Sequence, residues 1–277
     1  MHRVTTSWFQ EKPSPERKKG GTMSEAAPAS SARSQTQQPS QYNLTVSVED
    51  LLAAGSHFGH KAQRWSPKIA PYLYGEKDGI HIFDLFKTHE MLRKAAQRAY
   101  DLGRSGKSLV FVGTKRQAQA VILEETSAIN ASFVITRWLG GTITNWEQIK
   151  ISINKMNKLT QDLSAGALDE KYTKRERILM EKEKNRLERF LGGIATLKTA
   201  PDALFIVDIS HEKGAVKEAK AKGIEVIALV DTNADPTLVK YPIPANDDAI
   251  RSIKLIVHEI AVAYKEGRDT WQRTQDK

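Results

Sequence analysis

Apolar and polar positions alternate in two ways along the chain. Short, continuous apolar runs cover residues 108–112, 133–135, 203–208 and 225–231. Between and after them lie longer segments whose apolar residues recur every three or four positions, as on one face of a helix. These helical patterns cover about 88–102, 116–127, 215–222 and 248–265. The alternation predicts βαβ units, so the fold class is α/β: a Rossmann-like parallel sheet with helices on both faces.

Shorter elements precede this pattern. The spacing of Ser47 and Asp50 is that of a capping box, which predicts a helix over 48–54 that ends at Gly55. Two strand candidates, 69–74 and 80–84, flank a turn at 75–79.

Residues 144–191 interrupt the sheet pattern. Capping boxes at Thr144–Glu147 and Thr173–Glu176 each predict a helix start, and residues 164–169 form a loop between the two arms. Apolar residues at coiled-coil spacing predict a seam. Its members are Trp146, Ile149, Ile153, Met156 and Leu163 in the first arm, and Leu179, Met180, Leu187, Phe190 and Leu191 in the second. We expect an inserted antiparallel helical hairpin (a coiled coil) whose arms, roughly 27 Å long, reach a partner outside the sheet domain.

The ends of the chain lack such patterns. Residues 1–41 hold four of the ten prolines and few apolar side chains, which predicts a disordered tail. We favour Met23 as the true start, with the first 22 residues an upstream extension. The tail has no apolar signal core, and its three glutamates argue against an organellar transit peptide. The expected organisation is tail 1–41, sheet domain 42–143 and 192–266, hairpin 144–191, and C-terminal tail 267–277.

Composition narrows the function. The 277 residues include no cysteine, which excludes disulfides, thiolate metal sites and thiol catalysis. No uncharged apolar run is long enough for a membrane-spanning helix. Lys and Arg number 42 against 33 Asp and Glu, a net charge of +9. The hairpin alone carries eleven basic and eight acidic residues. This balance favours a polyanionic partner, with nucleic acid the first candidate.

Enzymatic motifs are incomplete. Residues 103–108 imitate a phosphate-binding loop, but they are two residues short and precede a strand, so we interpret them as a helix end and a turn. Gly113 stands alone where a dinucleotide fold needs three glycines. No nucleophile-elbow motif occurs. We therefore expect no catalytic residue, no cofactor and no small-molecule substrate. A nucleotide-binding α/β enzyme that has lost its phosphate motif remains the alternative, and a protein-binding coiled-coil adaptor is a third.

Several acidic residues could hold a ligand. Asp208 and Asp231 end strands, a position that can hold a metal or a ribose, but capping and turn formation are the commoner roles. The pair Asp247 and Asp248 follows Asn246 at a helix start, where capping explains it.

The segment 57–68 combines histidines, cations and an aromatic ring in what the pattern indicates is a loop. A metal needs three or four ligands, and no third ligand is near His57 and His60 in the sequence, so we expect no metal. Cations that neutralise phosphates and a ring on which bases stack suit RNA better. Lys61, Arg64, Trp65 and Lys68 provide these groups.

Two further segments repeat this chemistry. Arg137 and Trp138 precede a glycine pair. Lys115 and Arg116 stand at the start of a helix, whose free amides favour a bound phosphate. We expect the double change Lys115→Glu, Arg116→Glu to weaken RNA-dependent assembly without unfolding the domain. Trp65 and Trp138 fit core packing and RNA stacking equally well.

These segments resemble a known family. The stretch Leu51–His60, with Arg64–Lys68 after it, is similar to the opening of the bacterial-type ribosomal protein S2 family of the small subunit. Phe111–Ala118 and Arg137–Asn145 resemble the second and third blocks of that family. Later segments complete the set in the same order: 191–194, 201–203, 231–233 with 235–236, and 243–252.

The resemblance implies a non-enzymatic structural constituent of the small subunit, in the cytoplasmic ribosome, that binds rRNA and neighbouring ribosomal proteins in translation. Ribosomal protein S1 is among the implied neighbours, and no membrane is. Together with the basic residues of the hairpin, the matched blocks make up our RNA-facing candidates. They are His57, His60, Lys61, Arg64, Trp65, Lys68, Thr114, Lys115, Arg116, Arg137, Trp138, Asn145, Lys150, Lys174, Arg175 and Arg177.

Overall fold

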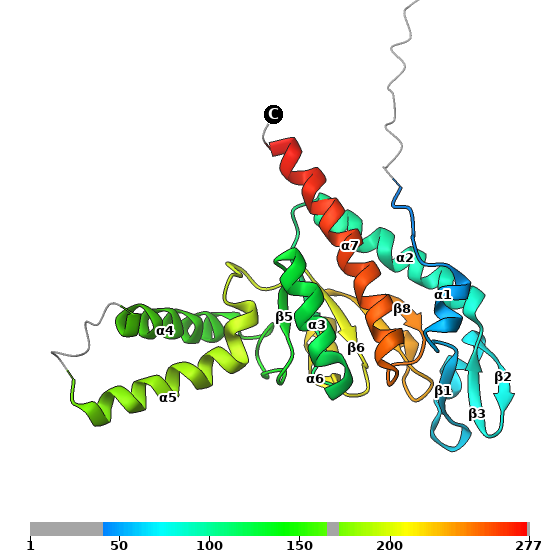
Figure 1. Ribbon diagram of the computed structural model, residues 1–277, viewed down its shortest axis with the longest axis horizontal. Helices are drawn as coiled ribbons and strands as arrows, with labels where there is room; N and C mark the ends of the chain where they lie inside the picture. Colours follow the sequence, from blue (N-terminus) through cyan, green and yellow to red (C-terminus); the bar gives the residue numbers. More distant parts are fainter. Residues whose placement is uncertain (1–40, 165–171, 276–277) are drawn as a thin grey trace, which may run out of the picture. The chain divides into compact units, whose positions relative to one another are not determined.

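A computed structural model describes residues 41–164 and 172–275 (Figure 1). The expected tail, the proposed start at Met23 and the loop between the hairpin arms lie outside the described residues, apart from Gln41 and Ser164. Within them, no helix is long and apolar enough to cross a membrane.

Five parallel strands form the central sheet. They are β4 (Leu109–Val112), β5 (Ser132–Val134), β6 (Ala203–Val207), β7 (Glu225–Val230) and β8 (Tyr241–Pro244). Their order is β5-β4-β6-β7-β8. This confirms the α/β class with a parallel sheet. The apolar patterning did not indicate β8, which contains Pro242 and Pro244. Proline is tolerated there because an edge strand leaves one side of its backbone unpaired.

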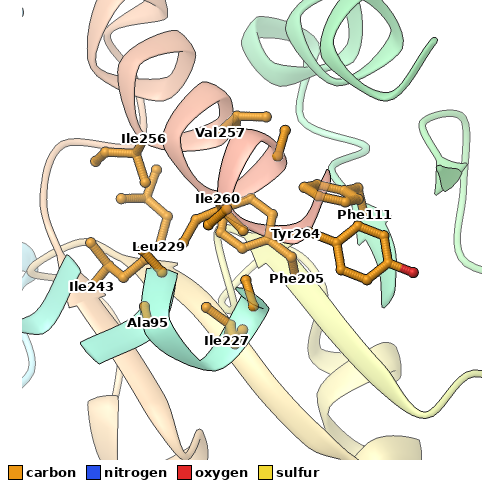
Figure 2. Close-up of a cluster of buried hydrophobic side chains, with 14 of the residues drawn as sticks. Ala95, Phe111, Phe205, Ile227, Leu229, Ile243, Ile256, Val257, Ile260 and Tyr264 are labelled. Atoms are coloured by element: carbon orange, nitrogen blue, oxygen red, sulfur yellow. The ribbon is translucent and has the colours of Figure 1, made fainter. Parts of the chain in front are cut away.

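Helices cover both faces of this sheet. One core contains apolar side chains from α2 (Leu85–Arg104), α3 (Arg116–Ile129) and α7 (Ile250–Gln275) together with alternate strand residues. Figure 2 shows Ile256, Ile260 and Tyr264 among the strand side chains of this core. On the opposite face, the other strand residues form a second core with α6 (Lys213–Lys222). Apolar side chains of α4 (Trp146–Ser164) and α5 (Lys174–Leu191) belong to the same core. Because the strands are buried on both faces, they are continuously apolar in the sequence.

Helices α2 and α7 cross at close range. Gly103 and Gly267 stand at the crossing, and a Cβ atom on either would collide with the backbone of the opposite helix. This contact supports α7 well past Lys265, where the pattern predicted its end, so the expected tail at 267–277 is helical through Gln275.

A small antiparallel sheet precedes α2. It contains β1 (Phe58–Lys61), β2 (Leu73–Lys77) and β3 (Ile80–Phe83), in the order β1-β3-β2. Helix α1 (Val48–Ala53) has the expected capping box of Ser47 and Asp50. The prediction of a loop over 57–68 is wrong, because β1 and the 3₁₀ helix η1 (Ala62–Arg64) lie within it.

The strand predicted at 69–74 also needs correction. Residues Pro67–Tyr72 form the 3₁₀ helix η2, and β2 begins only at Leu73. Pro67 and Pro71 restrict the backbone to the φ values of such a turn. The hairpin turn itself is tight, with positive φ at Asp78 (53°) and Gly79 (73°), as a type I′ turn requires.

Helices α4 (Trp146–Ser164) and α5 (Lys174–Leu191) interrupt the α/β pattern and run antiparallel to each other (Figure 1). The capping box of Thr173 and Glu176 is present. At α4, however, the hydroxyl of Thr144 donates to Glu218, and the helix begins at Trp146, one residue later than that box predicts.

The apolar seam between α4 and α5 differs in part from its prediction. Four α4 positions are buried: Trp146, Ile149, Ile153 and Met156. In α5, Leu187 and Leu191 are buried, but Leu179 is 58% exposed, which corrects its assignment. The helix places Leu179 outside the contacting stripe. A regular coiled-coil register along both arms stays a prediction.

Two short 3₁₀ helices complete the described elements. One is η3 (Gly192–Ile194), directly after α5, and the other is η4 (Pro236–Leu238), between β7 and β8.

Candidate nucleic-acid interface

The carboxyl ends of β4 and β6 form the switch point of the sheet, because the chain crosses from β4 to β5 on one side and continues at β6 on the other. Ligands of open α/β sheets bind at this place. Here it is closed by the protein itself. The backbone N–H and the hydroxyl of Thr114 donate to Glu212 at 2.9 and 2.5 Å. Asp208, in a left-handed conformation (φ 64°), accepts from two backbone amides of the next turn, as expected of a turn residue.

Lys115 extends from this point into a group of carboxylates. Its Nζ lies 2.5 Å from Asp247 Oδ1, 2.6 Å from Asp248 Oδ1 and 3.4 Å from Asp208 Oδ2. Burial lowers the pKa of Lys115, but the three carboxylates outweigh burial and raise that pKa above its usual range. Its side chain is only 13% exposed. An ammonium so enclosed and so neutralised is a poor phosphate ligand, which argues against direct RNA contact by Lys115.

Asp247 does more than cap a helix. Asn246, its predecessor, accepts hydrogen bonds from the amides of Asp248 and Ala249 and so caps the start of α7. Asp247 is fully buried, and burial, together with the charges of Asp231 and Asp208, raises its pKa to about 8. The interpretation of Asp247 as a simple cap is therefore wrong.

His57 and His60 lie in different surroundings. The ring of His57 contacts that of Phe58, with centroids 3.9 Å apart and the ring planes tilted by 40°, and burial lowers the pKa of His57. His60 joins the carboxylates: its Nδ1 is 3.1 Å from Asp231 Oδ1 and its Nε2 is 3.4 Å from Asp248 Oδ2. The hydrogen bond to Asp231 raises the pKa of His60 despite burial. The carboxylates that surround His60 therefore come from loops distant in the sequence, and not from residues near it.

Glu218, on α6, holds the loop that follows β5, a role that the sequence patterns did not reveal. Its carboxylate accepts five hydrogen bonds of 2.8–3.1 Å. The donors are Nε1 of Trp138, the backbone amides of Gly141, Ile143 and Thr144, and the hydroxyl of Thr144. Burial would raise the pKa of Glu218, but these donors outweigh it and lower the pKa. Trp138 is 8% exposed, so core packing explains this tryptophan.

The other cations of segment 61–68 are exposed. Lys61 and Arg64 make no ion pair with any residue that the structure describes. Trp65 is 38% exposed and its ring lies 4.7 Å from that of His81, which leaves part of it available for stacking. Lys68 is 59% exposed and pairs with Asp235 at 2.6 Å.

The remaining candidates lie apart from this segment. Arg116 is exposed at the first turn of α3, and Arg137 and Asn145 are exposed on the loop between β5 and α4. Lys150 is exposed on α4, and Lys174 and Arg175 are exposed on the first turn of α5, with Arg177 half-buried beyond them. The structure therefore divides the candidates among several surfaces.

A pocket near segment 61–68 reveals cations that the sequence patterns did not indicate. It has a volume of about 430 Å³, and Ser66, Asn233 and Asp235 line one side. Lys213, Lys217 and Lys220 line the other side, four and three positions apart on α6. This spacing places them on one face of the helix. We call them the basic face of α6; periodicity of lysines along a predicted helix was the signal that could have identified it.

Known proteins match this chain over most of its length. The model of a family described as ribosomal protein S2 matches residues 51–267. The chain belongs to this family. A small ribosomal subunit protein uS2 of Chlorobium chlorochromatii is 50% identical over 214 residues, which are 77% of this chain and 85% of the relative. Proteins of the same name from Wolinella succinogenes and Fusobacterium nucleatum are each 46% identical, over 80% of this chain and 82% and 90% of the relatives.

Both the family membership and the closed switch point argue against the alternative that the protein is a nucleotide-binding α/β enzyme. In such an enzyme, the loop after the first strand would present free amides to a phosphate. In this member of the S2 family, Glu212 accepts from Thr114, and the ammonium of Lys115 is neutralised by carboxylates. The negative charge of a nucleotide phosphate would be repelled there by the carboxylates of Asp208, Asp247 and Asp248.

Proposed function

We propose that this protein is a structural constituent of the small ribosomal subunit, without enzymatic activity, that binds rRNA and neighbouring ribosomal proteins. Its membership of the ribosomal protein S2 family supports this role and a place in the cytoplasmic ribosome. The observation that carries the rRNA contact is the basic face of α6, whose three exposed lysines line one pocket together with Ser66 of segment 61–68.

This arrangement suits a nucleic-acid backbone. Lys213, Lys217 and Lys220 are exposed, and so are Lys61 and Arg64 in the segment that contributes Ser66 to the pocket. Phosphates attract such cations regardless of base sequence, and the release of their counterions drives binding. The partly exposed ring of Trp65 adds a surface on which an unpaired base can stack.

We propose a second contact at the start of α5. Lys174 and Arg175 occupy the first helical positions, where the helix dipole disfavours positive charge. Such a placement costs stability unless an external anion lies nearby. A phosphate there would meet both the cations and the amides of the helix start. Further candidates for rRNA contact are Arg137 and Asn145 on the loop before α4, Lys150 on α4 and Arg116 on α3.

The hairpin and the protein neighbours belong to the same proposal. We infer that residues 144–191 form an inserted coiled-coil unit beside the sheet domain formed by 42–143 and 192–266. Its exposed apolar residues, Ile151, Ile178 and Leu179, support contact with another protein. Ribosomal protein S1 is the neighbour that we propose.

Salt-dependent co-sedimentation with small subunits tests the rRNA contact. The triple change Lys213→Glu, Lys217→Glu, Lys220→Glu removes the basic face of α6 without touching the core. For the unchanged protein, we expect affinity to fall about a thousandfold between roughly 50 and 200 mM salt if six or more phosphates are neutralised. The triple variant should bind more weakly and lose part of this salt dependence.

The matched control changes Lys94, Lys254 and Lys265 to Glu, three exposed lysines on α2 and α7. It alters the net charge equally, so it separates a local contact from general electrostatics. Equal weakening by both triple variants, or binding that does not respond to salt, would contradict the proposed interface.

A further inference from the structure

The pocket lined by the basic face of α6 lies at the carboxyl edge of the parallel sheet, and we call it the α6 pocket. Ile209 and Ser210 come shortly after β6, and Asn233, Ala234 and Asp235 belong to the connection that follows β7. Ligands of open α/β sheets bind outside the carboxyl ends of the strands. The switch point between β4 and β6 is closed, whereas the α6 pocket, at the ends of β6 and β7, is open to a ligand of about its volume, 430 Å³.

Apolar side chains form much of the α6 pocket. Ile209, Val216 and Ala234 are buried side chains that line it, and Leu238 at its border is 43% exposed. Phosphates are attracted by cations and gain nothing from aliphatic groups, so a contact with the RNA backbone alone does not explain this lining. Small-ligand sites combine an apolar lining with a few polar groups, as here. The pocket therefore fits a ligand that has an uncharged ring or chain beside its negative charge.

The charge at the α6 pocket is positive. Lys213, Lys217 and Lys220 are exposed and make no ion pair with any residue that the structure describes. Asp235, the acidic residue among those that line the pocket, pairs with Lys68 at 2.6 Å. Because this carboxylate already has a cation, the three ammonium groups of α6 are left for an anion from outside.

The three lysines form a row that is longer than one phosphate group. Lys213 and Lys220 are seven positions apart on α6, which is about 10 Å at 1.5 Å per residue. Phosphates of one strand in a regular helix follow each other about every 3.4 Å along the axis. The row therefore suits a continuing nucleic-acid strand better than a free nucleotide with a single phosphate.

Segment 61–68 brings an aromatic ring to the border of the pocket. The backbone amide of Ser66, which lines the pocket, donates to the carbonyl of Thr232 at 2.7 Å and so fixes the segment to the connection after β7. Trp65, with its partly exposed ring, is the residue before Ser66. Aromatic rings beside cations are typical of sites that bind unpaired bases.

Regular duplex RNA would leave the α6 pocket empty. In an A-form helix the bases are stacked inside, and side chains meet mainly phosphates and 2′-hydroxyls. Nucleotides in bulges and loops are different, because their bases turn outward and insert into protein sites. The volume of the pocket lies within the range of about 300–1,000 Å³ found for small-ligand sites, which is sufficient for one base.

We propose that the α6 pocket holds the base of one unpaired rRNA nucleotide, while phosphates of the same strand lie on the basic face of α6. The base packs against Ile209, Val216 and Leu238, and Ser210 and Asn233 offer a hydroxyl and an amide to its edge. This inference rests on the proposed rRNA contact and adds the form of RNA that the site recognises, a bulged or looped nucleotide.

Fluorescence anisotropy of the full-length protein with two labelled RNA hairpins tests this inference. One hairpin has a single bulged adenosine, and the other is identical but fully paired. We expect binding about tenfold tighter to the bulged RNA, because only that RNA supplies a base to the pocket. Equal affinity for both hairpins would overturn the inference and leave the proposed rRNA contact intact, whereas binding of neither would contradict both.

AMP, added as a competitor, separates the two sources of a base with a phosphate. We expect it to displace the bulged hairpin only at a large excess, because AMP provides one phosphate to a row of three lysines. Displacement at a concentration equal to that of the RNA would assign the pocket to a free nucleotide and overturn the inference.

Ser210→Trp fills the pocket and leaves every lysine in place. It should reduce the affinity for the bulged hairpin to that for the paired hairpin, which should itself not change. Ser127→Trp is the matched control, because it adds the same ring at an exposed position of α3, on the opposite face of the sheet, and should keep the preference. A preference that survives in Ser210→Trp would overturn the inference.

Leu238→Ala is the second variant, and it decides if circular dichroism shows that Ser210→Trp does not fold. Leu238 is 43% exposed, so its truncation should leave the fold intact. Removing an apolar contact of the base should lower the preference for the bulged hairpin at least about threefold. An unchanged preference in this variant would count against the assigned pocket in the same way.

Discussion

The carboxyl edge of the sheet and the hairpin of α4 and α5 use charge in opposite ways. At the sheet edge, Lys115 is 13% exposed and contacts three carboxylates. On the hairpin, Lys150, Lys174 and Arg175 are exposed and make no ion pair with the described residues. The same kind of side chain holds the fold together in one region and remains available for a partner in the other.

This difference has an energetic consequence. Breaking a buried ion pair leaves an uncompensated charge and costs about 3–5 kcal/mol, whereas an exposed pair contributes about 0–1 kcal/mol. Substitutions at the sheet edge should therefore act on stability, and those on the hairpin should act on binding. The following predictions test this contrast.

The largest effect is expected for Lys115→Glu. The change replaces the ammonium that pairs with Asp208, Asp247 and Asp248 by another carboxylate, which should lower the free energy of unfolding by more than about 3 kcal/mol. Urea denaturation followed by circular dichroism measures it. The sequence-based expectation that Lys115→Glu with Arg116→Glu leaves the fold intact is replaced by this prediction. Arg116→Glu alone, on an exposed position, is the control and should leave the midpoint unchanged.

Glu218→Ala should rank second. It removes the acceptor of five hydrogen bonds, and water can replace only some of them because Trp138 and Ile143 are buried. We expect a loss of about 2 kcal/mol. Glu218→Gln keeps one acceptor oxygen, so its free energy of unfolding should lie between those of the unchanged protein and Glu218→Ala. A stability of Glu218→Ala equal to that of the unchanged protein would show that this loop is held by packing alone.

The contribution of Glu218 should also depend on pH. Its pKa is lower in the folded state than in the unfolded chain, so its stabilisation is complete above its ordinary pKa. The stabilisation is lost as the pH falls through the folded-state pKa. The difference in unfolding midpoint between the unchanged protein and Glu218→Gln should thus narrow as the pH falls from about 7 to about 3. A constant difference over that range would contradict the assignment.

The double change Lys174→Glu, Arg175→Glu should act on RNA binding and not on stability, the opposite of the changes at the sheet edge. Acidic residues suit a helix start, so stability should be unchanged or rise by less than about 1 kcal/mol. Affinity for small-subunit rRNA should fall, and the slope of log affinity against log salt should decrease by about 2 because two phosphate contacts are lost. Filter binding over a salt series measures both. Unaltered affinity would remove the start of α5 from the interface.

The smallest effect is expected for Lys155→Ala. Lys155 pairs with Glu183 at 3.0 Å across the two hairpin helices, and the hydrogen bonds from Arg186 and, after it, Lys155 lower the pKa of Glu183 to about 2. Because the pair is exposed to water, the melting temperature should not change measurably. A clear decrease would show that the hairpin depends on its surface charges.

Local patterns were sufficient where a single segment decides its own structure. The capping boxes of Ser47 and Thr173 and the buried strands of the sheet lie where periodicity and turn chemistry place them. They failed where two segments meet. Strand β8 contains two prolines and is stable only as an edge, and α7 continues to Gln275 because Gly267 contacts α2.

The candidate site shows the same division. The sequence by itself determined the α/β class, the membership of the S2 family and the excess of cations, because these depend on residue order and composition. Only the tertiary structure decided which cations are available. Lys115 meets Asp247 and Asp248 across 132 and 133 positions of the chain, and His60 meets Asp231 across 171. Burial and charge pairing depend on distance in space, which separation along the chain does not reveal.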